Sequence, residues 1–234
     1  MKRDIEAVFF DAGYTLLCMD PDQPTIFVRV CAELGIELDR TRFAEGIDRA
    51  NALLAPRHPR EVPVPFSQEA IDRFWTTYNQ VLLSVCARDP RDPEKAEVVY
   101  RRFTTAITWR IYDEVHDVLG ELRGRGIRLG IISNWTGDLE EVLGRIGLRD
   151  PFDFVLDSAR FGHEKPHAVI FSEAVRRAGV EREAALHVGD SPDHDVDGAL
   201  AAGLKAVLLD RHGRHPGFDR APRVTTLGGV LDHL

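Results

Sequence analysis

The hydrophobic and polar positions of the chain follow two alternating periods from about residue 115 onward. Short apolar runs rich in β-branched residues are typical of buried parallel strands, and apolar residues three or four positions apart are typical of helices. This pattern predicts strands at 127–132, 154–156, 185–188 and 206–209, together with helices at 115–125, 139–146, 168–178 and 196–202. Such alternation predicts an α/β fold with a doubly wound parallel sheet.

One more apolar run, Ala7–Phe10, predicts a buried strand near the start of the chain. Between this strand and residue 105 the apolar residues recur at helical spacing, and no second buried strand is indicated. A helical block that interrupts a series of strands indicates an insertion. We therefore predict a Rossmann-like core domain made of residues 1–17 and 106–234, and an all-helical domain at 18–105.

Within the helical block, the prolines from Pro56 to Pro65 predict a loop. The aromatic residues Phe74, Trp75 and Tyr78 lie on a predicted helix and could line a substrate pocket. At helical spacing such residues are more often part of a packed core, and we favour that interpretation. No other feature of the helical block indicates which ligand the protein recognises.

Composition narrows the possible functions. The formal net charge of −8 argues against a general nucleic-acid-binding protein, which would carry a strongly basic surface. The 3 cysteines are widely spaced and form no CxxC pair, so the sequence predicts neither a disulfide framework nor a zinc site. Acidic residues interrupt the apolar stretch near the amino terminus, and no apolar segment is long enough to span a membrane. These features predict a globular cytoplasmic protein without a membrane partner.

Asp11 follows the first apolar run directly, so it is expected at the carboxyl end of a buried strand. Open α/β sheets bind their ligands at that end. A carboxylate is ionised at neutral pH and can attack an electrophile without the help of a base, which makes Asp11 a candidate nucleophile. The alternative is an aspartate that caps the turn after the strand.

A second acidic stretch follows the predicted strand at 185–188. Asp190 lies at the strand end, and Asp193, Asp195 and Asp197 follow within the turn that leads to the next helix. Like charges this close repel one another unless a cation binds between them or solvent separates them. Carboxylate oxygens at a phosphate-handling site suit Mg²⁺. Capping of a helix amino terminus explains an acid in the turn, but not the acid at the strand end.

Two further segments carry polar residues that suit an anionic ligand. Ser133 and Asn134 follow the predicted strand at 127–132, and they offer a hydroxyl and an amide to a phosphate oxygen. Lys165 precedes a proline near the start of a predicted helix, where its charge could neutralise a phosphate or a carboxylate. The alternative for Ser133 and Asn134 is an ordinary capping turn, and the alternative for Lys165 is a solvated surface lysine.

The order of these motifs resembles that of the haloacid dehalogenase-like hydrolase superfamily. The matching pattern covers essentially the whole chain and consists of Asp11-x-x-x-Thr15, Ser133-Asn134, Lys165-Pro166 and Gly189-Asp190-x-x-x-x-Asp195. The resemblance implies a Rossmann-like core with a helical cap inserted between the first and second motifs. It also implies hydrolysis of a small phosphorylated metabolite with the help of Mg²⁺.

The resemblance assigns roles to individual residues. Asp11 corresponds to the nucleophile, and Lys165 corresponds to the lysine that steadies its charge. The groups that correspond to those positioning the phosphate are Thr15, Ser133 and Asn134. The metal ligands implied in the same way are Asp11, Asp190, Asp195 and the backbone carbonyl of Gly13.

Gly13 departs from the family pattern. Phosphatases of the superfamily usually carry a second aspartate two residues after the nucleophile, where it serves as general acid and base. Glycine has no side chain that could transfer a proton. One reason for a glycine at this position would be a positive φ angle, which other residues adopt only with strain.

Three functions remain open on the sequence alone. A Mg²⁺-dependent phosphatase is favoured by Gly189-Asp190, because the fourth motif of the dehalogenases resembles Ser-Asn instead. A 2-haloacid dehalogenase would not need an acid at Gly13, because a halide leaves without a proton. The third is a catalytically weak phospho-ligand-binding or regulatory protein, and the presence of Asp11, Lys165 and Asp190 weighs against it.

Overall fold

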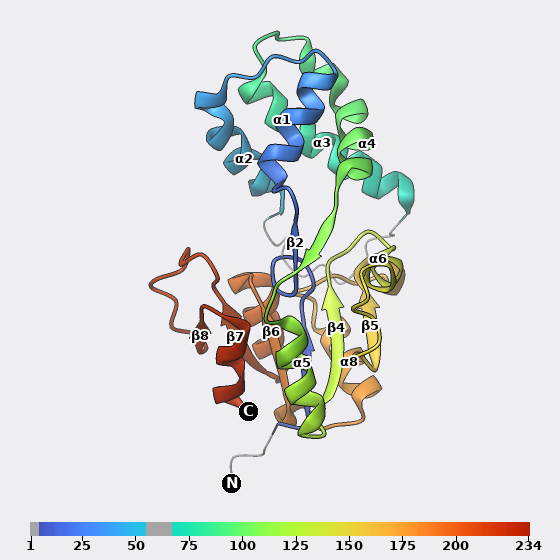
Figure 1. Cartoon of the computed structure of the whole chain (residues 1–234), viewed down its shortest axis with the longest axis vertical. Helices are drawn as coiled ribbons and strands as arrows, with labels where there is room; N and C mark the ends of the chain where they lie inside the picture. Colours follow the sequence, from blue (N-terminus) through green and yellow to red (C-terminus); the bar gives the residue numbers. More distant parts are fainter. Residues whose placement is uncertain (1–4, 55–66) are drawn as a thin grey trace. The chain divides into compact units, whose positions relative to one another are not determined.

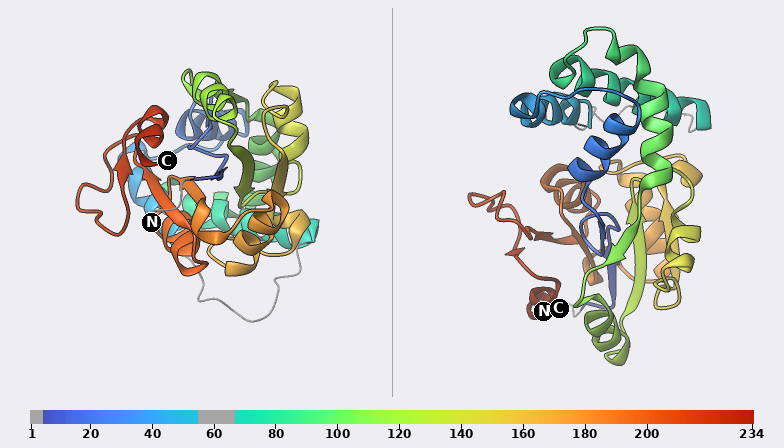
Figure 2. Two further views of the ribbon diagram at one scale, coloured as in Figure 1. Left: turned by 90° about the horizontal axis from the view of Figure 1, so that it is seen from below. Right: turned by 45° about the horizontal axis from the view of Figure 1, so that its top comes forward.

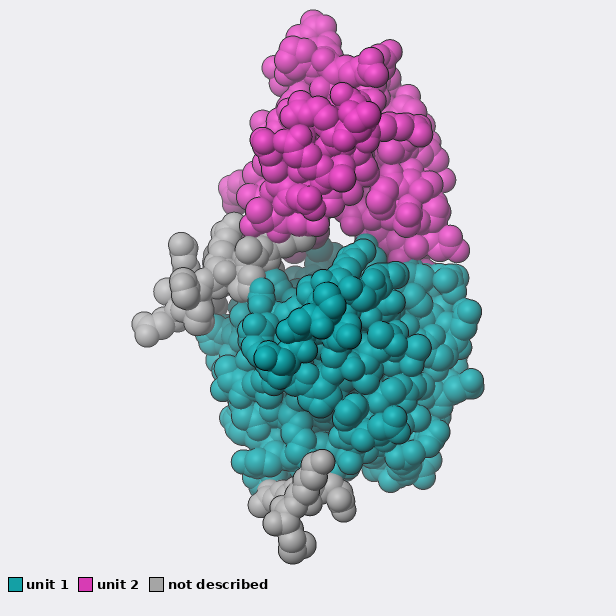
Figure 3. Space-filling model, turned by 90° about the vertical axis from the view of Figure 1, so that its left-hand side faces the viewer, with its two compact units in different colours: residues 1–18, 58–64, 110–234 teal, residues 19–57, 65–109 magenta. Residues whose placement is uncertain are grey.

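The computed structural model describes residues 5–54 and 67–234, which divide into two compact units. The described residues of the first unit are 5–18 and 110–234, and those of the second are 19–54 and 67–109 (Figure 3). The domain boundaries drawn above from the sequence stay a prediction. No helix in the described residues combines the length and the hydropathy that crossing a membrane requires.

A parallel sheet forms the centre of the first unit, with the strand order β5-β4-β1-β6-β7-β8. Its strands are β1 (Ala7–Phe10), β4 (Arg128–Ser133), β5 (Phe154–Asp157), β6 (Ala185–Gly189), β7 (Lys205–Leu209) and β8 (Arg223–Val224). Each strand runs parallel to its neighbours. The predicted α/β fold is therefore confirmed, and the short edge strand β8 is an addition that the hydrophobic pattern did not predict.

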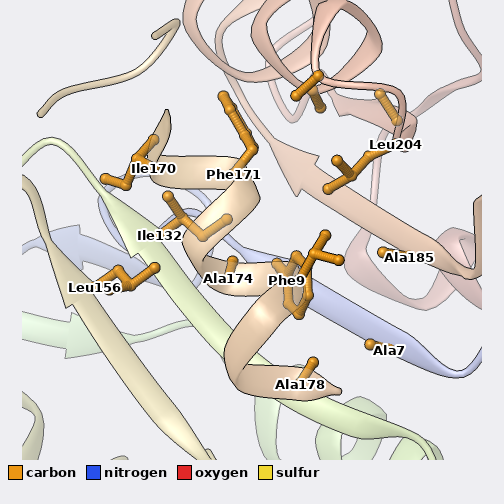
Figure 4. Close-up of a cluster of buried hydrophobic side chains, with 14 of the residues drawn as sticks. Ala7, Phe9, Ile132, Leu156, Ile170, Phe171, Ala174, Ala178, Ala185 and Leu204 are labelled. Atoms are coloured by element: carbon orange, nitrogen blue, oxygen red, sulfur yellow. The ribbon is translucent and has the colours of Figure 1, made fainter. Parts of the chain in front are cut away.

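Helices cover both faces of this sheet (Figures 1 and 2). They are α5 (Val115–Gly124), α6 (Leu139–Arg145), α7 (Ser158–Phe161), α8 (Ala168–Ala178) and α9 (Gly198–Ala201). Figure 4 shows Phe9 and Ile132 of the sheet beside Phe171 of α8, and all three side chains are buried. A fully buried side chain of this size contributes about 1.5–3 kcal/mol, so this layer holds β1 firmly in the centre of the sheet.

The prediction of a helix at 196–202 is wrong about the residue at which the helix begins. A π-helical turn at Pro192–Asp197 comes first, and α9 follows it. The turn begins after Ser191, whose hydroxyl accepts a hydrogen bond from the backbone N–H of His194 at 3.2 Å. Single π-helical turns are rare and occur frequently at functional sites.

The second unit is helical, as the spacing of its apolar residues predicted. Its helices are α1 (Gln23–Glu33), α2 (Phe43–Asn51), α3 (Gln68–Cys86) and α4 (Ala96–Ala106), with short 3₁₀ turns at Arg40–Arg42, Ala52–Leu54 and Asp92–Lys95. Tyr78 is buried in their common core, and Trp75 packs against that core, which supports a packing role for the aromatic residues. The predicted loop at Pro56–Pro65 lies outside the described residues.

The chain passes between the two units through a pair of short strands that the pattern did not predict. β2 (Leu17–Met19) and β3 (Trp109–Ile111) form a separate two-stranded sheet. Within this pair, the thiol of Cys18 lies 3.7 Å from the carbonyl oxygen of Arg110. The segment between β2 and β3 therefore begins and ends at adjacent points.

The carboxylate of Asp210 holds the loop that follows β7. It is buried and accepts hydrogen bonds from the backbone N–H groups of Arg214 at 2.8 Å and His215 at 2.9 Å, and from Arg223 at 2.9 Å. Burial opposes ionisation, but these donors outweigh it and lower the pKa of Asp210. An acid whose pKa is lowered by folding stabilises the folded state above its unfolded pKa of about 3.9, and this contribution is lost as the pH falls.

We expect Asp210→Asn to lower the free energy of unfolding by about 1.5–3 kcal/mol at neutral pH, the usual contribution of hydrogen bonds to a charged group. The difference from wild type should stay constant down to about pH 5 and shrink as the pH falls through the lowered pKa. Urea unfolding at several pH values measures this, with the exposed Asp219 changed to Asn as the control. A difference that grows on acidification would contradict the assignment.

Candidate active site

The register of the sheet brings the predicted site residues to one edge. Phe10, the last residue of β1, is level with Ile131 of β4 and Val188 of β6. Asp11 continues the ladder, because its N–H donates to the carbonyl oxygen of Val188 at 2.9 Å. Its side chain is buried at the carboxyl end of the central strand, and the polar residues that end β4 and follow β6 flank it. This is the edge at which open α/β sheets bind ligands.

The loop after Asp11 is a tight turn closed by backbone hydrogen bonds. The N–H groups of Leu16 and Leu17 both donate to the carbonyl oxygen of Ala12, each at 2.9 Å. Tyr14 adopts the left-handed region with a φ of 58°, whereas Gly13 has no positive φ. The expectation that Gly13 supplies a positive φ is therefore wrong, and the strained backbone position belongs to Tyr14.

Ser133 and Lys165 hold one oxygen of the Asp11 carboxylate. Ser133 donates from Oγ to Oδ1 of Asp11 at 2.9 Å, and Nζ of Lys165 donates to the same oxygen at 2.6 Å. All three residues are buried, and short hydrogen bonds to a charged acceptor are stronger than neutral ones. Because both donors contact Oδ1, they orient the carboxylate and leave Oδ2 without a hydrogen bond from either of them.

Asn134 fixes the backbone of Lys165. Its side-chain amide donates to the carbonyl oxygen of Lys165 at 2.9 Å and accepts from the N–H of Lys165 at 2.7 Å. The amide therefore joins the end of β4 to the loop that carries the lysine. Direct contact of Asn134 with a phosphate stays a prediction.

Asp195 contacts the other side of the lysine. Its Oδ1 accepts hydrogen bonds from Nζ of Lys165 at 2.6 Å and from Nε2 of His187 at 2.8 Å, and its Oδ2 accepts one from the N–H of Ser191 at 3.0 Å. Gly189 makes this approach possible, because a Cβ at that position would lie 2.1 Å from Cγ of Asp195. The end of β6 therefore requires a glycine.

Burial and neighbouring charges set the protonation states of the site. Burial alone would lower the pKa of Lys165, but Asp11 and Asp195 outweigh it and raise that pKa above its ordinary value. Burial raises the pKa of Asp11, and Lys165 only partly offsets the rise. Burial also raises the pKa of Asp190, and Asp11 and Asp195 add to the increase. Asp195 itself stays ionised, because Lys165 and His187 outweigh burial and lower its pKa well below the usual range.

The acidic residues form a candidate metal centre. Carboxylate oxygens of Asp11, Asp190 and Asp195 all lie within 4.8 Å of one another. Lys165 is the lysine that pairs with Asp11 and Asp195, so with all three acids ionised the cluster would carry more negative than positive charge, which agrees with the raised pKa values of Asp11 and Asp190. Among the described residues, no side chain donates a hydrogen bond to Asp190. A divalent cation with hard oxygen ligands would neutralise the excess charge, and the residues present therefore fit Mg²⁺.

Two buried polar atoms of the site lack a hydrogen-bond partner among the described residues. They are Oγ1 of Thr15 and Nδ1 of His187. Since Nε2 of His187 contacts the ionised Asp195, we place the ring proton on Nε2 and leave Nδ1 bare. Buried polar atoms without partners are uncommon and call for a ligand or a water. A missing partner at Oγ1 of Thr15 fits a hydrogen bond from this hydroxyl to an anionic ligand, and that contact stays a prediction.

Sequence reasoning missed two residues close to the predicted site: His187, which contacts Asp195, and Trp135, whose ring lies beside Gly13. His187 is a polar side chain inside the buried apolar strand β6, and that position was a signal that could have found it. Trp135 directly follows the motif Ser133-Asn134, but nothing in the local pattern separates it from an ordinary aromatic residue in a loop.

The model of one protein family, the haloacid dehalogenase-like hydrolases, matches residues 5–203. The chain belongs to this family. The match includes β1, the helical insertion and every predicted site residue, so the resemblance predicted from the motifs is confirmed.

Curated relatives of this haloacid dehalogenase-like hydrolase include a phosphatase. The chain is 39% identical to phosphoserine phosphatase from Thermus thermophilus over 189 residues, which are 72% of this chain and 75% of that protein. It is 45% identical to the human haloacid dehalogenase-like hydrolase domain-containing protein 3 over 114 residues, which are 49% of this chain. That match covers 45% of the human protein, so the chain spans about half the length of this relative.

Solved structures of similar proteins include a dehalogenase. The hydrolase YfnB from Bacillus subtilis superposes with a TM-score of 0.78 at 20% identity, with 99% of both chains covered, and shows the shared fold. The 2-haloacid dehalogenase from Pseudomonas syringae pv. tomato has a TM-score of 0.61 at 26% identity, with 97% of both chains covered. Homologues of this hydrolase thus comprise both phosphatases and dehalogenases, and the choice between them depends on the site.

Proposed function

We propose that this hydrolase is a Mg²⁺-dependent phosphatase that acts on a small phosphorylated metabolite through an aspartyl-phosphate on Asp11. The observation that carries the proposal is the cluster of Asp11, Asp190 and Asp195, in which the carboxylates outnumber the one lysine between them. A phosphate dianion would be repelled by this cluster unless a cation were bound there. Attack on a carbon–halogen bond needs no such cation, so the acidic cluster favours phosphate chemistry.

Each residue has its own part in the proposed reaction. Asp11, oriented through Oδ1 by Ser133 and Lys165, attacks phosphorus with Oδ2. The bond from phosphorus to the leaving oxygen breaks as the bond to Asp11 forms. The hydroxyl of Thr15 and the third N–H of Lys165 donate hydrogen bonds to the phosphate oxygens as charge moves between them. Ser133 has one hydroxyl proton, which it donates to Asp11 before the attack, so it can donate to the phosphate only after Oδ1 of Asp11 has lost its charge to the new bond. Water then attacks the phosphorus atom and releases phosphate, which restores Asp11.

The residues that would hold Mg²⁺ are Asp11, Asp190 and the backbone carbonyl of Gly13, with Asp195 as a further candidate. When bound, the cation supplies positive charge that offsets repulsion between the nucleophile and the phosphate. Both oxygens of Asp195 already accept hydrogen bonds from Lys165, His187 and Ser191. We therefore assign Asp195 an additional part, which is to hold Lys165 against Asp11.

A panel of phosphorylated metabolites, assayed with and without Mg²⁺, tests the proposal, and 2-chloropropionate belongs in the same panel. We expect phosphate release from at least one compound only with Mg²⁺, and no release of chloride. Chloride release in excess chelator would reject the proposal and establish the dehalogenase, which Gly13 favours because a halide leaves without a proton. Binding of phosphate esters with no turnover of any compound would establish a regulatory protein instead.

Asp190→Asn is expected to weaken Mg²⁺ binding at least about 10- to 100-fold. Mutation of a residue that only hydrogen-bonds to a metal ligand already weakens metal binding by that factor, and Asp190 is a proposed ligand. Mg²⁺ titration of the phosphatase rate and calorimetry of Mg²⁺ binding measure the change. The control is Asp193→Asn, which removes an exposed carboxylate from the same turn. An unchanged Mg²⁺ requirement in Asp190→Asn would show that Asp190 is not a ligand.

A further inference from the structure

The indole ring of Trp135 borders the place where Gly13 lacks a side chain. A Cβ added at Gly13 would lie 3.6 Å from Cζ3 of Trp135, which is ordinary van der Waals contact, and no other described residue beyond the chain neighbours comes within 4 Å. Gly13 follows Asp11 by two residues, and Trp135 follows Ser133, which holds Asp11, by two residues. The benzene edge of the indole therefore lies along the loop that carries the nucleophile.

The ring is held in place by contacts at both ends of the residue. The backbone N–H of Trp135 donates to Oγ of Ser158 at 3.1 Å, and this hydroxyl lies 3.3 Å from the carbonyl oxygen of Trp135. The indole Nε1–H donates to Oδ1 of Asp138 at 2.9 Å. The polar atom of the ring is engaged with Asp138, and the atom of the ring that lies beside Gly13 is a carbon.

We propose that Trp135 is a specificity-determining residue, which forms an apolar wall beside the leaving group of a phosphoric monoester. The substrate class that fits this wall is an ester whose leaving group is a planar aromatic alcohol or an enol. This inference rests on the phosphatase function proposed above and names its substrate class. An aromatic ring gains favourable contact with an indole, whereas the hydroxyl groups of a sugar find no hydrogen-bond partner at this edge.

Gly13 and Trp135 favour the same substrates for two separate reasons. Without an acid at position 13, the leaving oxygen departs with its electron pair and without a proton, which a phenolate or enolate tolerates better than an alkoxide. The Asp11–phosphorus bond forms as the bond to this oxygen breaks. Water then attacks phosphorus, its proton passes to solvent, and phosphate leaves. The sum of the steps consumes one water and yields the free alcohol and phosphate.

Steady-state kinetics with naphthyl phosphate and glycerol phosphate test the wall. Trp135→Ala should raise KM for naphthyl phosphate by up to about 10-fold, the size of one aromatic contact, and should leave KM for glycerol phosphate and the Mg²⁺ requirement unchanged. Trp135→Phe should restore most of the wild-type KM. Leu200→Ala, which truncates an exposed apolar residue on α9, is the control. An equal rise of both KM values would overturn the proposal, since it would show that Trp135 only shapes the loop.

Binding of phenylphosphonate and methylphosphonate in the presence of Mg²⁺ keeps this inference separate from the proposed function, because it needs no turnover. Wild type should bind phenylphosphonate up to about 10-fold more tightly, and Trp135→Ala should bind both compounds equally. Equal binding of phenylphosphonate and methylphosphonate by wild type would contradict the proposed role of Trp135, even if the enzyme hydrolyses phosphate esters. Tighter phenylphosphonate binding without hydrolysis of any ester would support the wall and reject the phosphatase.

Discussion

Asp11→Asn is expected to lower turnover of any substrate by about 10⁴-fold or more, because an amide oxygen is a poor nucleophile and the proposed covalent step depends on Oδ2. Phosphate release in the steady state and acid-quenched trapping of the phosphorylated enzyme measure the loss. The exposed Asp113, changed to Asn, is the control and should keep wild-type turnover. Turnover at the wild-type rate by a folded Asp11→Asn protein would show that another residue is the nucleophile.

The same substitution should leave the melting temperature unchanged or raise it when Mg²⁺ is absent. Burial raises the pKa of Asp11, so the ionised carboxylate is less favourable in the folded chain than in the unfolded chain. An acid with a raised pKa destabilises the folded state at pH values above that pKa, and asparagine removes this cost. The amide oxygen of asparagine still accepts hydrogen bonds from Ser133 and Lys165. A large drop in melting temperature would contradict the protonation states assigned to the site.

Gly13→Asp is expected to raise kcat for alkyl phosphates by up to about 10²–10⁴-fold, the usual contribution of a positioned general acid. Aryl phosphates should gain much less, because their leaving groups need no proton. The backbone allows the change, since Gly13 has no positive φ and its added Cβ would meet Trp135 at an ordinary 3.6 Å. The measurement is the ratio of kcat for glycerol phosphate to kcat for p-nitrophenyl phosphate in a folded, Mg²⁺-binding variant.

Gly13→Ala is the matched control for this experiment, because it adds the same Cβ without a carboxyl group. It should keep the wild-type ratio of alkyl to aryl turnover. If wild type already hydrolyses both esters equally fast, another group donates the proton and the idea of a missing acid fails. A rise in alkyl turnover by Gly13→Ala would likewise assign the effect to packing against Trp135.

The elements that the sequence predicts best are those in which hydrophobic period and chain-breaking residues agree. The helix predicted at 168–178 matches α8, because its apolar face is regular and Gly179 ends it with a φ of 68°. β2 and β3 could not be predicted, since strands of 3 residues are too short to show a period. Their pairing also joins residues far apart in the sequence, which local patterns do not encode.

The candidate site was predictable at strand ends and less so within the turns. Asp11 and Ser133 come together through strand register, which follows once the parallel sheet is assigned. The contact of His187 with Asp195 depends instead on the π-helical turn, which brings the carboxylate back over Gly189. The predicted helix at 196–202 begins after Asp195, so the sequence pattern gave no indication of this turn or of the contact that it makes.

The adjacent ends of the segment between β2 and β3 make the helical unit a replaceable module. Paired strands lie about 4.8 Å apart, so a turn of a few residues would be enough to connect Cys18 to Arg110 directly. Segments of very different length can be grafted at this point without stretching β1 or the loop that carries Asp11. One scaffold of this kind can therefore accept a different inserted segment at this point, while the residues that hold Asp11 stay unchanged.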